Sequence, residues 1–316
     1  MKKRIVVALG GNAIKQSNEE GTAEEQMRNI ENSCHHILRL AGAGHEIVLT
    51  HGNGPQVGNL LIQQETGVPQ TPVQPMDICG AMTQGQIGYM LQQTLMNGLK
   101  DNNHDPNVVS VVTQVMVDRE DPDFKNPSKP VGPFYDEATK LKYEKERAYT
   151  IKKVLPNGDR PFRRVVASPD PIRILGGESV KHLVDAGMFV VASGGGGIPV
   201  ILNEQDQWEG VEGVIDKDLA GEKLAEAVGA DILLILTDIK KVKMGYGTDE
   251  EKDLDRMTAA EARQYLEEGH FLPGSMGPKV LACIRFLEHG GEEAIITDLG
   301  GAWSALNDGE GTHICS

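Results

Sequence analysis

Three apolar runs in this chain end abruptly at glycine, and that arrangement limits the available folds more than any other feature. Residues 5–9 precede Gly10 and Gly11, residues 47–49 precede the 52–54 loop, and residues 190–192 precede four consecutive glycines at 194–197. A short apolar run bounded by glycine is typical of a buried strand. A following helix offers unpaired N–H groups and a positive dipole end to an anion, which glycine lets approach closely. One run alone favours an ordinary strand-to-helix turn, whereas three together favour a phosphate-binding cleft.

Length and charge exclude several classes of protein. A chain of 316 residues can bury a substantial core, in one large α/β domain or two smaller ones. The formal net charge is −15 and there is no long basic block, so nucleic acid is not an expected partner. No apolar run approaches the roughly 20 residues of a transmembrane helix. The basic start lacks a secretory apolar region, and we therefore expect a cytoplasmic protein with no membrane partner.

The cysteines and histidines do not predict a metal site. The four cysteines are scattered, without a C-x-x-C pair or histidines at zinc-site spacing, which favours reduced, mostly structural thiols. The adjacent His35 and His36 would point about 100° apart on a helix, so they rarely share an ion. We predict no metal ligands among the side chains of the chain.

Helices and strands are expected to alternate along most of the chain. Thr22–Glu25 and Thr258–Glu261 each have the pattern of a capping box at the start of a helix. Pro55 suits the first turn of another helix, and Gly277-Pro278 can open a further one. Other helices are predicted near 82–99, 178–186 and 218–228, and strands near 108–112, 189–192, 232–236 and 294–297. This order predicts a mainly parallel sheet with helices on both faces.

The alternation breaks between about residues 118 and 171. Seven prolines precede Pro171 in this segment, together with many charged residues, and the segment could be a disordered linker or an inserted small subdomain. Six phenylalanines and tyrosines favour the second interpretation, because a solvated linker carries few aromatic anchors. We therefore expect one domain over residues 1–316, with an inserted lid subdomain at 118–171.

Three common enzyme motifs are absent from the sequence. No G-x-x-x-x-G-K-[ST] sequence is present, which argues against a P-loop NTPase. The segment 52–58 places its last glycine one position too late for a dinucleotide-binding loop, so a nicotinamide enzyme is a weak alternative. There is no G-x-S-x-G nucleophile turn either, and acyl-enzyme hydrolysis lacks a visible nucleophile.

Three lysines stand in settings that suit phosphoryl transfer. Such a transition state spreads negative charge over the transferred group, and N–H donors, ammonium groups and Mg²⁺ supply most of the catalysis. Lys217 lies between Asp216 and Asp218, where an exposed lysine beside an acidic helix start is an equally good explanation. Lys279, at a predicted helix start, opposes the helix dipole unless an anion compensates it. Lys129 taken alone fits a solvated loop lysine.

The order of these motifs resembles that of the carbamate kinases, a group within the amino acid kinase superfamily. The resemblance covers nearly the whole chain and is most specific in the Asn-Pro-Ser-Lys-Pro segment at 126–130. The other matching segments are 8–12, 51–58, 83–85, 124–134, 194–199, 215–218 and 274–276. A departure occurs at 157–164, where a glycine-rich stretch is common in the family and only the pair Arg163-Arg164 is retained.

The resemblance implies a fold and a set of site residues. The fold is a three-layer αβα sandwich, with an open, mainly parallel eight-stranded sheet and a protruding lid subdomain. Lys217 and Lys279 would contact the transferred phosphoryl group, Asp218 would position both lysines, and Lys129 would reach carbamate or carbamoyl phosphate from the lid. The residues implied to bind substrate and phosphate are Gly10, Gly11, Asn12, Gly52, Asn53, Gly54, Gly195 and Gly196, and those near the nucleotide are Thr237, Asp238, Tyr246 and Met276.

The implied activity is reversible, Mg²⁺-dependent phosphoryl transfer between ATP and carbamate, which gives ADP and carbamoyl phosphate. ATP synthesis from carbamoyl phosphate, in arginine or purine-derived catabolism, is the expected direction, and a homodimer is the expected assembly. Two alternatives stay open from the sequence. One is a kinase for another small carboxylate, such as an N-acylated amino acid, and the other is a non-catalytic nucleotide-binding regulator.

Overall fold

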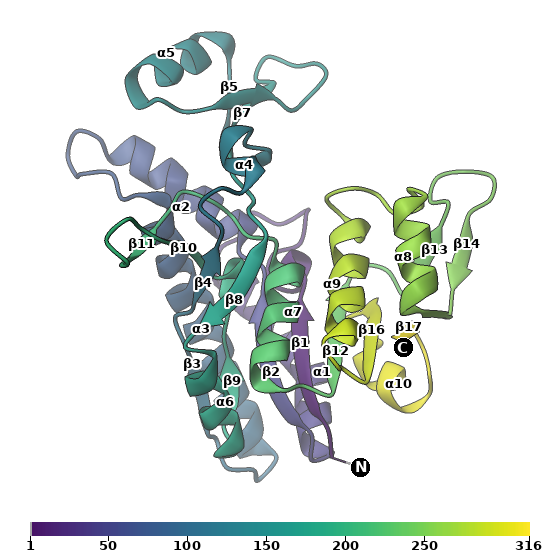
Figure 1. The fold of residues 1–316 in the computed structure, drawn as a ribbon. Helices are drawn as coiled ribbons and strands as arrows, with labels where there is room; N and C mark the ends of the chain where they lie inside the picture. The colour runs from purple at the N-terminus through teal and green to yellow at the C-terminus, as the bar shows by residue number, and fades with distance from the viewer. Residues whose placement is uncertain (1) are drawn as a thin grey trace.

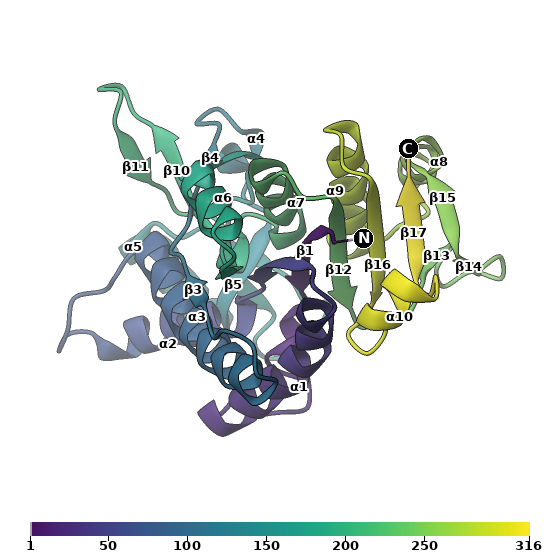
Figure 2. The same cartoon turned by 90° about the horizontal axis from the view of Figure 1, so that it is seen from below.

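A sheet of eight strands forms the centre of the computed structural model, which describes residues 2–316 (Figure 2). Its order is β15-β17-β16-β12-β1-β2-β9-β3, and every neighbouring pair is parallel except β16 with β17. The strands are β1 (Arg4–Leu9), β2 (Glu46–His51), β3 (Val108–Ser110), β9 (Phe189–Val191), β12 (Ile232–Thr237), β15 (Arg256–Thr258), β16 (Glu293–Asp298) and β17 (Thr312–Cys315). The open, mainly parallel eight-stranded sheet expected from the sequence is confirmed.

Helices cover both faces of this sheet, as Figure 2 shows from below. On one face, β1 presents Ile5, Val7 and Leu9 to α1 (Ala23–Gly42), α3 (Met76–Asp101) and α10 (Ala302–Asn307). On the other face, Val6 and Ala8 belong to a core with α6 (Gly177–Asp185), α7 (Lys217–Val228), α8 (Ala259–Glu267) and α9 (Met276–Glu288). Successive strand residues point to opposite faces, so one short apolar run serves two cores.

The predicted helix starts agree with the structure. The side chains of Thr22 and Thr258 each accept a hydrogen bond from the backbone N–H of the third helical residue. That residue is a glutamate in both helices, and its side chain accepts a hydrogen bond from the backbone N–H of the threonine, so both capping boxes are present. Pro55 lies in the first turn of α2 (Gly54–Gly67), where its missing N–H has no helical partner to lose. The helix expected near 82–99 is longer than predicted, since α3 begins at Met76.

The glycine run at 194–197 leads into a strand and not into a helix start that could bind an anion. It forms a short 3-10 turn, η2 (Gly194–Gly196), which leads directly into β10 (Ile198–Leu202). Gly195, Gly196 and Gly197 all have φ values between +67° and +88°, a region that an α-helix of L-residues does not use. A 3-10 turn, η1 (Gly11–Ala13), also follows β1, and only the 52–54 loop leads at once into an α-helix.

A protruding unit, residues 122–166, rises from one end of the molecule (Figure 1). It contains a three-stranded sheet in the order β5-β7-β6 together with two helices. These elements are α4 (Pro122–Lys125), β5 (Lys129–Tyr135), α5 (Glu137–Arg147), β6 (Ile151–Lys153) and β7 (Phe162–Val166). Tyr143 packs edge-to-face against Tyr135 and Tyr149, with ring centroids 5.4 and 6.1 Å apart. Aromatic anchors therefore order a segment whose prolines and charges disfavour a large core.

A four-stranded sheet joins the protruding unit to the main body. Its order is β11-β10-β4-β8, with β4 (Gln114–Val117), β8 (Pro171–Leu175) and β11 (Trp208–Gly210). The chain enters the protruding unit after β4 and leaves it before β8. A hairpin of β13 (Val242–Met244) and β14 (Lys252–Leu254) lies near the C-terminal helices. The four cysteines are free, and no helix within residues 2–316 combines the length and apolar character that a bilayer crossing requires.

Candidate active site

Three of the residues singled out in the sequence meet between the first turns of α7 and α9. Asp218 accepts hydrogen bonds from two ammonium groups, that of Lys217 at 2.5 Å and that of Lys279 at 2.9 Å. Each lysine uses a different carboxylate oxygen. The anion that a lysine in the first turn of α9 requires is therefore Asp218, and the structure places Lys217 and Lys279 side by side on one carboxylate.

Asp218 is held as an anion by this arrangement. Its side chain is 3% exposed, and burial on its own would raise the pKa of the carboxyl group. The charges and hydrogen bonds of Lys217 and Lys279 outweigh that effect and hold the pKa of Asp218 below its ordinary value. Two lysines sharing one carboxylate leave an excess of positive charge, which suits a site for an anion.

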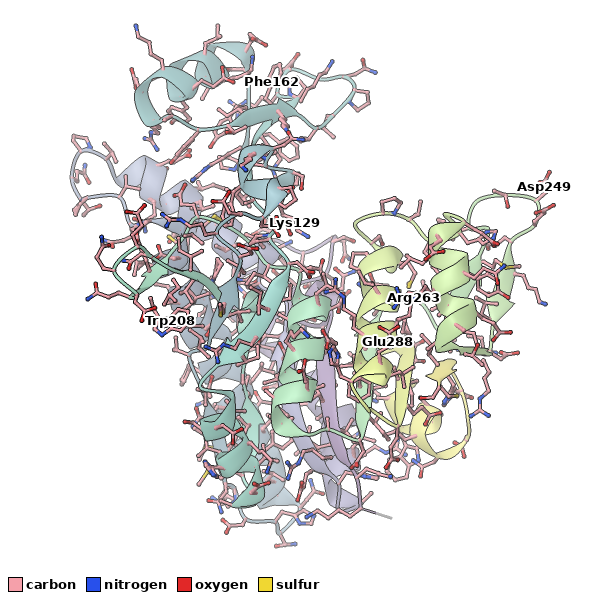
Figure 3. All side chains as sticks on the ribbon, in the orientation of Figure 1. Lys129, Phe162, Trp208, Asp249, Arg263 and Glu288 are labelled. Carbon is pink, nitrogen blue, oxygen red and sulfur yellow. The ribbon has the colours of Figure 1, made fainter. Side chains whose placement is uncertain are left out.

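Lys129 joins the same cluster from the protruding unit. It is the first residue of β5, and its Nζ lies 3.5 Å from Oδ2 of Asp216, the N-cap residue of α7. Figure 3 shows Lys129 at the base of the protruding unit. All three lysines predicted from the sequence are thus gathered around the N-terminus of α7, although they come from three separate parts of the chain.

Two of the glycine loops lie against these lysines. A side-chain carbon added at Gly52 would stand 3.3 Å from Cδ of Lys217 and 3.5 Å from the backbone nitrogen of Gly11. Gly10 is equally close to β12, since its added carbon would be 3.1 Å from the carbonyl oxygen of Leu236. Glycine therefore lets the ends of β1, β2 and β12 approach one another beside Lys217. Gly54 differs, because the space around it is open.

The third glycine loop closes the site from the side of β9. A side-chain carbon at Gly195 would overlap the Asn53 amide, and one at Gly196 would overlap the carbonyl of Ile215, just before Asp216. Asn53 is itself fixed, since its amide donates a hydrogen bond to the Thr83 hydroxyl at 2.8 Å. Gly195 and Gly196 are therefore in direct contact with the segments that carry Asn53 and Lys217.

The predicted nucleotide residues line a pocket next to this cluster. Thr237, Asp238, Tyr246 and Met276 all border a cavity of about 180 Å³. The rest of its lining comes from Ile239, Lys243, His270, Phe271, Leu272 and Ser275. Thr237 and Asp238 also border a second cavity of about 270 Å³, which is lined in part by Gly10 and Asn12. The Asn12 amide donates to Asp238 at 2.6 Å, so the glycine loop contacts a residue that borders both cavities.

Two residues that the sequence did not single out support the loops. Gln84 on α3 donates to the carbonyls of Gly194 and Thr113 and accepts from the Thr113 N–H, which fixes the glycine run. His51 is buried at the end of β2, with Nδ1 3.0 Å from the Gly52 carbonyl. Burial lowers the pKa of His51 to about 4, so at neutral pH it is uncharged beside Lys217. Both residues lie in segments that carry the family resemblance, and this resemblance was the sequence signal that could have identified them.

One group of potential metal ligands comes together in the described part of the chain. Glu222, Glu226 and His289 could each offer an atom to a common ion. The Lys223 ammonium, however, lies 2.9 Å from Glu226 and 3.5 Å from Glu222. Lys223 therefore occupies the position next to both carboxylates, and the group is explained as an ion-pair cluster between α7 and the end of α9 in which Glu222 is only partly compensated.

Comparisons with known proteins agree with the geometry. The model of the amino acid kinase family matches residues 3–298. The carbamate kinase of Pyrococcus furiosus is 51% identical over 316 residues, and that of Thermococcus kodakarensis is 52% identical over 315, with 99% of each chain covered in both cases. The structure of carbamate kinase from Giardia lamblia bound to AMP-PNP superposes with a TM-score of 0.94 at 40% identity, over 99% of this chain and 98% of that one. The chain therefore belongs to the amino acid kinase family, and within it to the carbamate kinases.

Proposed function

We propose that this chain catalyses reversible phosphoryl transfer between ATP and carbamate, which forms ADP and carbamoyl phosphate. The full-length similarity to carbamate kinases supports this reaction. Within the structure, the observation that carries the proposal is the Asp218 carboxylate shared by Lys217 and Lys279. That arrangement presents two ammonium groups to an anion while holding both in fixed positions.

The chemistry requires little beyond alignment and charge. Carbamate brings its own anionic oxygen, so no general base is needed. That oxygen attacks the terminal phosphorus of ATP, the bond from this phosphorus to the ADP oxygen breaks, and negative charge spreads over the transferred group. Lys217 and Lys279 would offset this charge, and the backbone amides of the loops at 10–12, 52–54 and 195–196 would bind the phosphoryl and acyl oxygens. Lys129 would hold the carbamoyl end.

The nucleotide is assigned to the cavity bordered by Thr237, Asp238, Tyr246 and Met276. Phe271 and Leu272 give this cavity an apolar part that suits a base, and it adjoins the glycine loop at Gly10 through the shared Thr237 and Asp238. The Giardia relative was solved with AMP-PNP, which supports a nucleotide site in this fold. Mg²⁺ would arrive as part of the nucleotide substrate, because both oxygens of Asp218 are engaged by lysines. Bound to the phosphates, Mg²⁺ screens the repulsion between the two anionic substrates.

The setting and assembly are also proposals. We assign the physiological direction to ATP synthesis from carbamoyl phosphate in arginine or purine-derived catabolism, in the cytoplasm. The protruding unit would act as a lid over the substrate, since it carries Lys129. A homodimer is supported by an apolar stripe on α3, formed by the exposed side chains of Ile78, Met82, Tyr89 and Met96. The spacing of these residues places them on one face of the helix.

The test is ATP formation by the purified protein from ADP, Mg²⁺ and carbamoyl phosphate. Acetyl phosphate and acetylglutamyl phosphate, supplied in parallel, measure the preference for the acyl group. We expect strong preference for carbamoyl phosphate, and no ATP when Mg²⁺ is chelated. Preferential use of acetylglutamyl phosphate would reassign the substrate. Binding of ADP by a folded protein that makes no ATP from any donor would contradict the enzyme activity itself.

A further inference from the structure

The two oxygens of Asp216 have different partners. Oδ1 accepts a hydrogen bond from the Asp218 N–H at 3.0 Å and so caps the N-terminus of α7. Oδ2 lies 3.5 Å from Nζ of Lys129. The side chain of Asp216 is 17% exposed, so this ion pair is partly shielded from water. One carboxylate therefore contacts both the helix that carries Lys217 and Asp218 and the strand that begins with Lys129.

Among the hydrogen bonds and ion pairs within residues 2–316, the Lys129 ammonium group has one partner, Asp216. The backbone of Lys129 is fixed by strand pairing with Val166 of β7, which lies within the same protruding unit. Other polar contacts of the protruding unit run elsewhere, from Tyr135 to Glu65 on α2 and from Arg164 to Glu212 in the loop after β11. Among the ion pairs of the described residues, the pair with Asp216 is the one that ties this unit to the start of α7.

The ion pair between Lys129 and Asp216 affects both the conformational freedom of the lysine and the charge of the site. A lysine side chain loses considerable rotational freedom when it is held in one geometry. If Asp216 already orients Lys129, most of that cost falls before the substrate binds, and the substrate meets a preorganised ammonium group. The cluster then holds three ammonium groups and two carboxylates, so one positive charge remains for an incoming anion.

We infer that Asp216 is a positioning residue, which holds Lys129 over the first turn of α7 and thereby prepares the site for carbamoyl phosphate. The kinetic part of this inference rests on the proposed function, because it requires that Lys129 meets this substrate. The structural part, an anchor between the protruding unit and α7, does not depend on the reaction.

Asp216→Asn separates the two contacts. Asparagine caps a helix about as well as aspartate, so α7 keeps its start while the charge that faces Lys129 is lost. The matched control is Asp136→Asn, because Asp136 caps α5 through a hydrogen bond from the Thr139 N–H at 2.7 Å. Thermal unfolding followed by circular dichroism should give the same midpoint for both variants and the unaltered protein.

The kinetic readout is the split between KM and kcat. We expect D216N to raise the KM for carbamoyl phosphate about fivefold, as for loss of a partly exposed ion pair, with kcat and the KM for ADP almost unchanged. In a Lys129→Met background the same change should have no further effect, because the partner is gone. An equal rise in that background would overturn the inference, and so would a fall in KM, which would mean that Asp216 competes with substrate.

Amide hydrogen exchange, measured without substrates, tests the anchor independently of catalysis. Exchange in β5 should be faster in D216N than in the unaltered protein or in D136N. Unchanged exchange in β5 would contradict the anchor whatever the kinetics show. If the unaltered protein makes no ATP from carbamoyl phosphate, the proposed function fails, while the exchange result still decides whether Asp216 holds Lys129 in place.

Discussion

At the scale of single residues, the centre of the site is one buried carboxylate between two ammonium groups. Removing a partner from a buried ion pair is usually severe, because the remaining charge is left unpaired. Asp218 is protected from this outcome, since each of its oxygens has its own lysine. Loss of one lysine leaves the other paired with Asp218, so activity should fall much more than stability.

Lys217→Ala should therefore affect turnover far more than folding. We expect kcat to fall by about 10²- to 10³-fold, the usual cost of removing one stabilising group from a transition state. The free energy of unfolding, measured with urea, should change by about 1 kcal/mol or less. Lys181→Ala, which removes an exposed lysine of α6, is the control. Near-normal turnover in a folded K217A protein would remove Lys217 from the site.

Glu222, one turn further along α7, makes stability depend on pH. Burial raises the pKa of Glu222 above its ordinary value of 4.5, and the opposing charges of Lys223 and His289 do not compensate fully. The folded protein therefore holds this proton more tightly than the unfolded chain. The carboxyl group costs stability progressively as pH rises from 4.5 through the folded pKa.

Glu222→Gln should consequently stabilise the protein more at pH 7.5 than at pH 5, by about 1 kcal/mol at the higher pH. Urea unfolding at the two pH values measures the difference. Glu204→Gln, on an exposed loop, should change nothing at either pH. A gain for E222Q that is the same at both values would show that titration of Glu222 is not its cause.

At the scale of elements, features set by local contacts were predicted better than features set by long-range strand pairing. The capping boxes at Thr22 and Thr258 fix helix starts through contacts within four residues, and both starts were predicted correctly. In the protruding unit, β5 pairs with β7 across a long interval that contains α5 and β6, so the extents of these strands could not be predicted from periodicity. The 3-10 turn at 194–196 was not predicted, because positive φ values are a property of the folded backbone. The meeting of Lys129, Lys217 and Lys279 could be predicted only through the family resemblance.

Gly196→Ala tests why that run needs glycine. Gly196 has a φ of +88°, and an added carbon would overlap the carbonyl of Ile215. Gly229, the C-cap residue of α7, has a φ of +64° with open space around it, so Gly229→Ala measures the cost of the backbone conformation alone, about 1–2 kcal/mol. We expect G196A to be less stable than G229A by at least about 2 kcal/mol and to reduce turnover, because the segment before Lys217 must shift. Equal stability of the two variants would contradict this crowding.

At the scale of the whole molecule, the segments that resemble the family motifs include strand ends of the central sheet. The family and the fold could therefore be predicted together. Alternate residues of β1 feed different cores, and the strand ends carry the glycine loops to one edge. The oligomeric state could not be predicted in the same way, because nothing in the sequence alone marks the apolar residues of the α3 stripe as exposed. Its apolar side chains appear as a surface only after the helix is placed at the outside of the sandwich (Figure 2).

Tyr89→Glu should convert the proposed homodimer into a monomer. Tyr89 is 61% exposed in the middle of the α3 stripe, and a charge there would be buried without a partner in a dimer interface. Light scattering after size-exclusion chromatography measures the mass. Leu155→Glu, an exposed position in the protruding unit, should leave the mass unchanged. A dimeric Y89E protein would place the interface elsewhere, and a monomeric unaltered protein would contradict the homodimer.

The crowding around the glycine run also has a consequence for descent. At each of the four glycines, the space for a side chain is occupied by another part of the chain: His51 at Gly194, Asn53 at Gly195, Ile215 at Gly196 and Val115 at Gly197. A mutation that adds a side chain to the run succeeds only if a second, remote mutation makes room for it. Single-step evolution is thus blocked at the floor of the site. New acceptor specificities would have to begin outside the run, as at Gly54, where the space for a side chain is open and the backbone φ is not positive.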